Sequence, residues 1–509
     1  MKPSKYDEQG FVERFHRGFM PNSTVPYLAS MTPREVSGTP CEVHTVDEYV
    51  QIDLDYLSLF EPPRGAKTLV ALVGVQSHQL HRALDLAACA LDRGALAVIG
   101  GPHPMTCDTA MLQNRGVAFS LSEAEIVWPA ILEDAVSGGL RPVYGGEERW
   151  QKQLDPPVLR SPSQRDLRRY AVPMLGVYPA RGCPYSCNFC SVIKIAGHAV
   201  RSQPLETTLA SLRAAKAAGV RFVMFTSDNF NKYPEVRSLA EAMVAERIEL
   251  PFFAQCDAQI HRDPDLVALL ARAGCFQMFV GAESFNTATL RQAHKFHNDP
   301  EKYARIVALC RENGITTHFS NILGFPADTE DGILEHLSTL RKLAPDVASF
   351  YILTPIPGTE QYDDFLRDGW ITETNLDRFD GTTVTWRHPN LSKGELRRLL
   401  FRCYRGFYPA ADVASKLWRI FRRRRDYRSF AALFAVSGLS VMSRMASARR
   451  LHPMAGGIGR LRKDRASDYS GLRRRTFGID LAPLPSSLPL AKEDEEINRR
   501  AKLVTASAG

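Results

Sequence analysis

The chain has 509 residues, of which 44% are hydrophobic and 24% charged, and its formal net charge is +8. This composition indicates a globular protein of about three domains and argues against a disordered or fibrous chain. The first ten residues are charged, which argues against a secretory signal, and no run approaches the ~18 consecutive apolar residues of a spanning helix. We therefore expect a cytoplasmic protein whose ten cysteines stay reduced.

Residues 1–150 are expected to form a first α/β domain. The continuous apolar run Thr68–Val75 is typical of a buried parallel strand, and helical spacing follows it at 81–91 and again at 123–136. Further strands are expected at Cys41–Val46, Ala95–Ile99 and Val117–Leu121. Strands alternating with helices predict a doubly wound parallel sheet, which binds ligands beyond the carboxyl ends of its strands.

A Pro- and Arg-rich linker, 151–171, leads to a second domain over residues 172–357. Six apolar strands are expected there: Met174–Tyr178, Phe222–Thr226, Phe252–Gln255, Gln277–Gly281, Thr317–Leu323 and Ser349–Thr354. Helical segments lie between them: Glu206–Ala218, Glu235–Ala245, Asp265–Ala273, Pro300–Asn313 and Glu330–Leu343. Six β/α units are too few for a closed eight-stranded barrel, so we expect a partial (β/α)6 barrel.

Residues 358–450 are expected to form a mostly helical cap, and residues 451–509 a basic, poorly ordered tail. Segment 416–450 mixes large apolar residues such as Trp418 and Phe430 with many arginines. Such basic amphipathic segments can lie on anionic membrane surfaces. The alternative is a solvated charged helix that packs its apolar stripe on the cap. No nucleic-acid-reading motif accompanies the basic run, so nucleic-acid binding is not expected.

The segment Tyr178–Val192 carries three cysteines, Cys183, Cys187 and Cys190, in the spacing Cys-x3-Cys-x2-Cys. Thiolates are the ligands of iron–sulfur clusters. Three thiolates leave one iron of a [4Fe–4S] cubane without a protein ligand. That iron can bind the amino and carboxylate groups of S-adenosylmethionine (SAM), and an electron from the cluster can cleave SAM to a 5′-deoxyadenosyl radical. The alternative is a zinc site that lacks a fourth ligand, with His198 as a stray candidate.

The motif follows an expected strand, at the end of the barrel where catalytic residues collect. With Phe189 before its last cysteine it resembles the radical SAM superfamily signature. Phe225–Phe230, Gly281–Ser284 and Asn321–Pro326 resemble other family segments at neighbouring strand ends. The resemblance implies these SAM-binding residues: Phe189, Asp228, Gly281, Glu283, Ile322, Gly324 and Pro326.

The first domain resembles the cobalamin-binding domain of the B12-dependent radical SAM group. The similarity lies in Val46–Val50, Leu72–His78, Ile99–Pro104, Ser122–Leu132 and Pro142–Gly146. It implies cobalamin as a further cofactor, bound by Gln76, Ser77, Gly100, Gly101 and Glu123. The Asp-x-His-x-x-Gly motif of many B12 proteins is absent, and Ser122 stands where the family usually has Gly. The alternative is a sheet with only a structural role, and no histidine is assigned as a metal ligand.

The segments Leu353–Tyr362 and Gly369–Gly381 resemble an extension of lipid- and pigment-modifying members, such as hopanoid methylases and the anaerobic cyclase of chlorophyll synthesis. The resemblance implies a cobalamin-dependent methyltransferase that acts at an unactivated carbon. Its substrate is expected to be large and lipid-like, or else another small molecule. A flavodoxin or ferredoxin is expected as electron donor, and segment 416–450 as a peripheral contact with the inner face of a membrane. Two alternatives stay open: a radical SAM cyclase, oxidoreductase or rearrangement enzyme without methyl transfer, and a non-enzymatic metal-binding regulatory protein.

Overall fold

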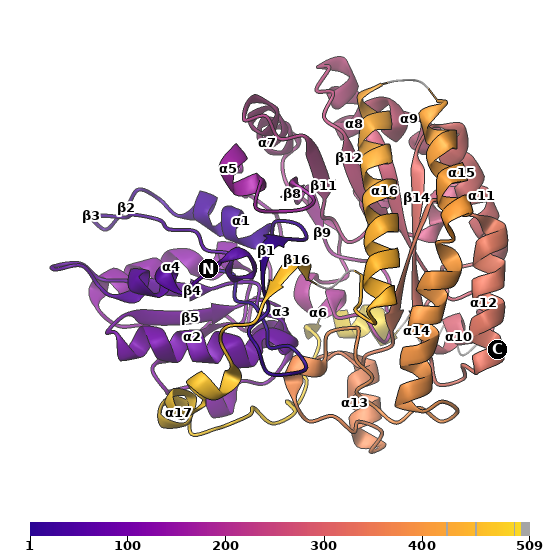
Figure 1. Ribbon diagram of the computed structural model, residues 1–509. Helices are drawn as coiled ribbons and strands as arrows, with labels where there is room; N and C mark the ends of the chain where they lie inside the picture. Colours follow the sequence, from indigo (N-terminus) through magenta and orange to yellow (C-terminus); the bar gives the residue numbers. More distant parts are fainter. Residues whose placement is uncertain (424–425, 454–455, 493, 500–509) are drawn as a thin grey trace.

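The computed structural model describes residues 1–423, 426–453, 456–492 and 494–499, and contains two parallel sheets (Figure 1). The first sheet has the order β4 (Leu69–Leu72), β5 (Leu96–Gly100), β6 (Val117–Ser120) and β7 (Val143–Tyr144). All three pairings in it are parallel. The strand expected at Cys41–Val46 is wrong: β2 (Glu35–Val36) and β3 (Thr39–Pro40) form a small hairpin, and most of 41–46 is exposed without a strand partner in the described chain.

Helices cover both faces of the first sheet, as expected. Helix α2 (Leu80–Asp92) shares one buried cluster with Leu72 and Ile99, whereas α4 (Ala124–Ser137) packs on Val98 from the other face. Neighbouring residues of a strand point to opposite faces, so Val98 and Ile99 contact different helices. Short helices α1 (Thr24–Met31), α3 (Pro102–Thr106) and α5 (Gln164–Leu167) complete this half.

The second sheet confirms the six expected β/α units. Its order is β8 (Met174–Val177), β11 (Phe222–Phe225), β12 (Phe252–Cys256), β13 (Cys275–Glu283), β14 (Thr316–Leu323) and β15 (Val347–Ile352), all parallel. The intervening helices are α7 (Leu205–Ala217), α8 (Val236–Ala245), α9 (Pro264–Ala273), α10 (Thr287–Gln292), α11 (Tyr303–Glu312) and α12 (Glu330–Leu343). Because β8 and β15 have no further neighbour among the described strands, the sheet is open, and the barrel curvature stays a prediction.

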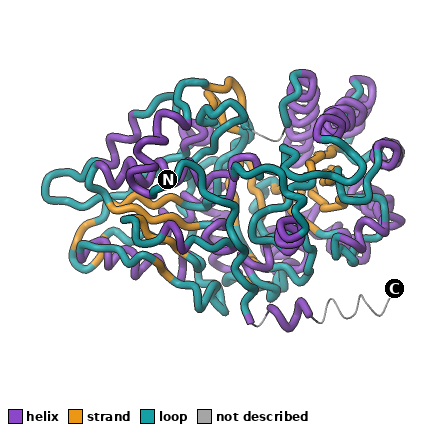
Figure 2. The backbone as a smooth tube through the Cα atoms, turned by 90° about the horizontal axis from the view of Figure 1, so that it is seen from below, coloured by secondary structure: helices purple, strands orange, loops and turns teal. Residues whose placement is uncertain are grey.

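Shorter elements connect these units. Strands β9 (Ala180–Arg181) and β10 (Arg201–Ser202) pair with each other and flank α6 (Val192–Ala196). The 3-10 turns are Glu48–Val50, Asp55–Phe60, Ser77–Gln79, Ala110–Leu112, Phe230–Lys232, Ala258–Arg262, Pro300–Lys302 and Leu376–Arg378. Seen from below, the strands lie mainly in two groups, one for each sheet (Figure 2).

The third region is helical, as expected, with α13 (Glu360–Arg367), α14 (Lys393–Phe407), α15 (Ala410–Phe421) and α16 (Tyr427–Ala448). Tyr408 directly follows α14. Its hydroxyl donates to the Ala348 carbonyl of β15 at 2.7 Å and fixes this helix on the sheet. Helix α16 is long and apolar enough, by length and composition, to cross a membrane. The helix is not a run of consecutive apolar residues, because Ser437, Gly438 and Ser440 lie within it, so the sequence expectation on that point stands.

The prediction of a poorly ordered tail is wrong for the described residues beyond 455. Strand β16 (Gly457–Leu461) pairs antiparallel with β1 (Arg14–Gly18). Helix α17 (Ala466–Phe477) lies beside α2, at the lower left of Figure 1, and Arg473 Nε is 2.9 Å from Asp85 Oδ1. Tyr469 and Phe477 are buried there, so the tail has an apolar anchor despite its basic composition. Residues 500–509 lie outside the described part.

Candidate active site at the junction of the two sheets

The three cysteines of the motif lie in the loop 182–191, which we call the cysteine loop. It connects β9 to α6 at the carboxyl end of the second sheet. Cys187 is buried, and Cys183 and Cys190 are half-buried. Gly182 has φ +107°, and a Cβ there would lie 2.2 Å from the Ala199 carbonyl oxygen, so only glycine fits before the first cysteine. Asn229 Nδ2 lies 3.0 Å from Cys183 Sγ. The loop is therefore held in a fixed conformation.

The three thiols interact electrostatically. Burial raises the pKa of each, and the charge of neighbouring thiolates raises the pKa of Cys183 further and that of Cys190 to about 12. Such thiols ionise only beside a strong cation, which suits ligands of iron. No three His, Cys, Asp or Glu side chains of the described chain converge on a position for one metal ion. A cubane needs no such convergence, because each thiolate binds a different iron, so the donor set fits a cluster.

Lys295 lies beside the cysteine loop, and the sequence analysis missed it. Its Nζ atom is 3.4 Å from Glu283 Oε1 and 5.9 Å from the centre of the Phe189 ring. Burial opposes its charge, but the negative charges of Glu283 and of the three cysteines together raise the pKa of Lys295. A buried cation is thus held between the predicted cluster ligands and the predicted SAM residues.

Glu283 occupies the strained end of β13. Its φ of +62° is in the left-handed region that non-glycine residues rarely adopt, which is a frequent feature of functional sites. A Cβ on Gly281 would lie 2.6 Å from Glu283 Oε1, so glycine leaves room for the carboxylate. Asn298 Nδ2 donates to the carbonyl oxygens of Gly281 at 2.8 Å and Ala282 at 3.0 Å and braces this strand end.

Of the remaining predicted SAM residues, four lie toward the cap and Asp228 lies beside Gly182. Phe189 and Ile322 belong to one apolar cluster with Phe325, whose ring meets that of Phe189 edge-on at 6.2 Å. Gly324 and Pro326 form the turn after β14, and the Gly324 amide donates to Asp328 at 2.8 Å. Asn390 Nδ2 donates to the Pro326 carbonyl at 3.3 Å, so this turn contacts the cap. Asp228 accepts from the Gly182 amide at 3.3 Å, and burial raises its pKa to about 6.

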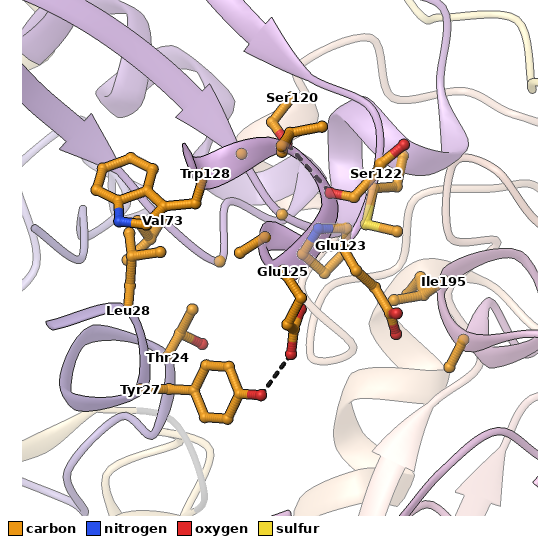
Figure 3. Close-up of a pocket in the computed structure, with 18 of the residues that line it drawn as sticks. Thr24, Tyr27, Leu28, Val73, Ser120, Ser122, Glu123, Glu125, Trp128 and Ile195 are labelled. Carbon is orange, nitrogen blue, oxygen red and sulfur yellow. Dashed lines mark hydrogen bonds between the residues drawn. The ribbon is translucent and has the colours of Figure 1, made fainter. Parts of the chain in front are cut away.

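A cavity of about 310 Å³ lies between the strand ends of the first sheet and residues that flank the cysteine loop, among them Arg181 and Val192 (Figure 3). The predicted cobalamin residues Gly100, Gly101 and Glu123 line it, together with Asp228. Its deep wall is apolar and consists of Leu28, Val98, Val127, Trp128 and Ile131. A Cβ on Gly101, which has φ +133°, would lie 2.2 Å from the Val75 amide nitrogen, so this strand end requires glycine.

Gln76 and Ser77 are not among the residues that line this cavity. Gln76 caps the turn 77–79, and Ser77 Oγ lies 2.9 Å from Nδ1 of the buried His103. Ser77 is buried within the first domain, whereas Gln76 is exposed, and neither faces this cavity.

A buried ion-pair network joins the two halves at the cavity rim. Arg181 Nη2 is 2.7 Å from Glu125, and Arg201 binds Glu123 through two contacts of 2.8 and 2.9 Å. The Tyr27 hydroxyl donates to Glu125, as Figure 3 shows. Both carboxylate oxygens of Glu123 are thus bound to Arg201. Sequence reasoning missed Arg181, although an arginine directly before Gly182 and Cys183 was a visible signal.

A second cavity of about 520 Å³ lies against the first. Thr226, at the end of β11, lines both cavities. The second cavity combines apolar walls, among them Phe19 and Met224, with charged residues such as Lys2. Tyr351 lines it from β15, and its pKa is raised by burial and by the charge of Glu283. This cavity therefore adjoins the first cavity at Thr226 and reaches Tyr351 of β15.

Known proteins share these features. The profile of the Radical SAM superfamily matches residues 177–340. A bacteriochlorophyllide d C-8(2)-methyltransferase of Chlorobaculum tepidum is 26% identical over 378 residues, which cover 69% of this chain and 78% of the relative. An anaerobic magnesium-protoporphyrin IX monomethyl ester cyclase of Rubrivivax gelatinosus is 23% identical over 58% of this chain and 51% of its own. A hopanoid C-2 methylase of Rhodopseudomonas palustris is 25% identical over 38% of this chain and 39% of its own.

The solved structure of the radical SAM methyltransferase TsrM from Kitasatospora setae, with cobalamin and a [4Fe–4S] cluster bound, shares the fold. Its TM-score is 0.54 at 16% identity, and the match covers 77% of this chain and 91% of TsrM. The matched profile contains the cysteine motif, Asp228 and Glu283, which confirms the family predicted from the sequence. Residues 177–340 therefore form a radical SAM domain, and 69% of the chain is similar to a methyltransferase.

Proposed function

We propose that this enzyme is a cobalamin-dependent methyltransferase that acts at an unactivated carbon of an apolar, lipid-like substrate. The observation that carries the proposal is the first cavity. Strand ends of the first sheet and Asp228 from the cysteine-loop side line the same space. A cofactor held by the first domain would therefore face the radical site directly. The methyltransferase relatives support this proposal.

The proposal assigns each group to residues of this chain. Cys183, Cys187 and Cys190 hold the cluster, Phe189, Gly281, Glu283 and Ile322 border SAM, and the strand ends at Gly100 and Gly101 face cobalamin. Lys295 pairs with the SAM carboxylate, because it is a buried cation beside both the cysteines and Glu283. When bound, the cluster and SAM supply the 5′-deoxyadenosyl radical, and cobalamin supplies methyl-transfer chemistry.

The substrate is proposed to occupy the second cavity. Its volume of about 520 Å³ lies in the usual range for small-molecule sites. Phe19, Met224 and Tyr351 offer an apolar wall, and Thr226 marks the point where this cavity meets the first one.

Single-turnover product analysis tests methyl transfer. Reduced enzyme, reconstituted with the cluster and loaded with cobalamin, should form about one S-adenosylhomocysteine per cobalamin from SAM before any substrate is added. Cys187→Ala should lose 5′-deoxyadenosine formation, and Cys41→Ala, which alters a cysteine outside the motif, should keep it. Formation of 5′-deoxyadenosine without any cobalamin-dependent S-adenosylhomocysteine would contradict the proposal and favour the cyclase-type alternative.

We propose a flavodoxin or ferredoxin as electron donor and a cytoplasmic location. We also propose peripheral contact with the inner face of a membrane through segment 416–450, of which residues 424 and 425 lie outside the described part. The apolar composition of α16 supports this contact.

A further inference from the structure

Helix α16 packs mostly small residues on the protein, together with the partly buried Leu433 and Leu439, and exposes several large apolar residues on its other side. The ring of Phe434, at the edge of that side, stacks on the buried Phe222 ring at 5.5 Å. The side that packs on the protein consists of Ala431, Ala432, Val436, Ser440, Ser443 and Ser447, all buried. The opposite side exposes Phe430 at 61%, Val441 at 53% and Met445 at 56%, and Phe434 is also exposed. A helix of a soluble protein normally turns its large apolar residues toward the core. The exposed Phe430, Val441 and Met445 therefore mark the outer side as a surface that another apolar phase covers.

The exposed side chains form one stripe. Positions 430, 434, 441 and 445 are separated by four, seven and four residues, so they lie on one face of a helix with 3.6 residues per turn. The buried side of α16 packs against α14, β13 and β15, so the helix lies along the surface of the molecule (Figure 1). The exposed side of α16 can therefore lie flat against a surface outside the protein.

Helix α15 adds two aromatic residues at one end of this stripe. Trp418 is 58% exposed, and its ring stacks on that of the exposed Phe421 at 6.0 Å. Only residues 422–426 separate α15 from α16, and the two helices lie side by side, so Trp418 and Phe421 are at the end of the pair that carries Phe430. We call the exposed residues Trp418, Phe421, Phe430, Phe434, Val441 and Met445 the outer face.

The charge around the outer face is almost entirely positive. Segment 416–450 contains ten lysines and arginines against one acidic residue, Asp426. Arg422 lies with its guanidinium 5.8 Å from the Trp418 ring, and the exposed Arg444 and Arg449 flank the stripe near Met445. Arg444 Nη1 donates to the Tyr408 carbonyl at 2.7 Å, which leaves its other guanidinium N–H groups for an anion. In the described part of the chain these three arginines have no acidic partner within 4 Å. Two copies of this face would repel each other, whereas an anionic surface complements it.

We propose that the outer face binds an anionic phospholipid bilayer, with α16 lying parallel to the membrane and Arg422, Arg444 and Arg449 at the phosphate groups. An apolar stripe flanked by arginines is the pattern of helices that bury one side at the boundary between headgroups and acyl chains. The inference deepens the proposed membrane contact by naming its surface and the charge of the lipid. An enzyme bound in this way would take up a lipid-like substrate from the bilayer.

Vesicle co-sedimentation of the full chain tests the inference. The probes are vesicles of phosphatidylcholine alone and vesicles with 30% phosphatidylglycerol. We expect the wild type to bind the anionic vesicles at least tenfold more tightly than the neutral ones. The triple variant Phe430→Ser, Val441→Ser, Met445→Ser should bind anionic vesicles at least tenfold more weakly than the wild type. The variant Arg422→Gln, Arg444→Gln, Arg449→Gln should lose the preference for anionic vesicles.

A matched control removes three exposed apolar residues elsewhere: Ile52→Ser, Val244→Ser, Ile458→Ser. It should bind vesicles like the wild type. An unchanged circular dichroism spectrum and thermal midpoint show that each variant is folded. Equal binding by the stripe variant and the control would overturn the inference. So would a wild-type dimer in light scattering that the stripe variant converts to monomer, because the outer face would then cover a second copy. Vesicle binding requires no SAM cleavage, so its outcome is independent of the methyl-transfer test.

Discussion

At the scale of single residues, Lys295 is the most informative position. The proposal pairs it with the SAM carboxylate, and a charge-assisted hydrogen bond contributes about 1.5–3 kcal/mol. We therefore expect Lys295→Met to weaken SAM binding roughly tenfold to hundredfold. The measurement is a SAM titration that follows the electron paramagnetic resonance spectrum of the reduced cluster. Lys302→Met, which alters an exposed lysine nearby, should leave the affinity unchanged. Equal affinities for Lys295→Met and the wild type would remove Lys295 from the SAM site.

The cysteine motif and Glu283 could be predicted from the sequence, because their spacing and their positions after apolar strands are local signals. Lys295 could not. It lies twelve residues beyond Glu283, and only the packing of the intervening helix α10 returns it to the cysteine loop. Glu123 illustrates the opposite case. Its position at the cavity was predicted, but its carboxylate is bound to Arg201, which no local pattern indicates.

At the scale of elements, the contact between α17 and α2 predicts a pH effect. Burial raises the pKa of Asp85 from 3.8 to about 6, although Arg473 opposes the shift. A raised pKa means that the folded state holds the proton more tightly than the unfolded state. The stabilisation from this group is complete below pH 4 and is lost as the pH rises through 6.

Asp85→Asn removes this titration. Between pH 7 and pH 5 the wild type should gain about 1 kcal/mol relative to Asp85→Asn, and differential scanning fluorimetry of both proteins at the two pH values measures the gain. Asp92→Asn, at the end of the same helix, should behave like the wild type. A constant difference in thermal midpoint between the Asp85 variant and the wild type would show that Asp85 does not titrate in this range.

Most strands and helices followed from hydrophobic periodicity, since each reflects the burial of its own residues. The pairing of β1 with β16 did not, because the two strands are more than 400 residues apart in the chain and both are short. The tail was interpreted from its basic composition, which hides the few buried residues, such as Phe477, that anchor it. The sequence likewise could not show which apolar residues of α16 are exposed, because that depends on how the helix packs on the sheet.

At the scale of the whole molecule, the first cavity and the cysteine motif are built from different residues. We therefore expect that a substitution in the cavity can weaken cobalamin binding without affecting the cluster. Ala71 lines the first cavity from β4. We expect Ala71→Phe to fill part of this space and to weaken hydroxocobalamin binding at least tenfold, as followed by absorption, without a change in iron content. Ala66→Phe, on an exposed loop before the same strand, should bind hydroxocobalamin normally. Full binding by Ala71→Phe would place the corrin elsewhere.

The proposed chemistry requires that Cys183, Cys187 and Cys190 hold a [4Fe–4S] cluster with one iron free to bind SAM. Electron paramagnetic resonance of the anaerobically reconstituted, dithionite-reduced protein, combined with iron and sulfide analysis, tests it most directly. About four irons and four sulfides per chain are expected, with a cluster signal that shifts when SAM is added. A protein that takes up no iron or sulfide, or a cluster signal that SAM leaves unchanged, would contradict it.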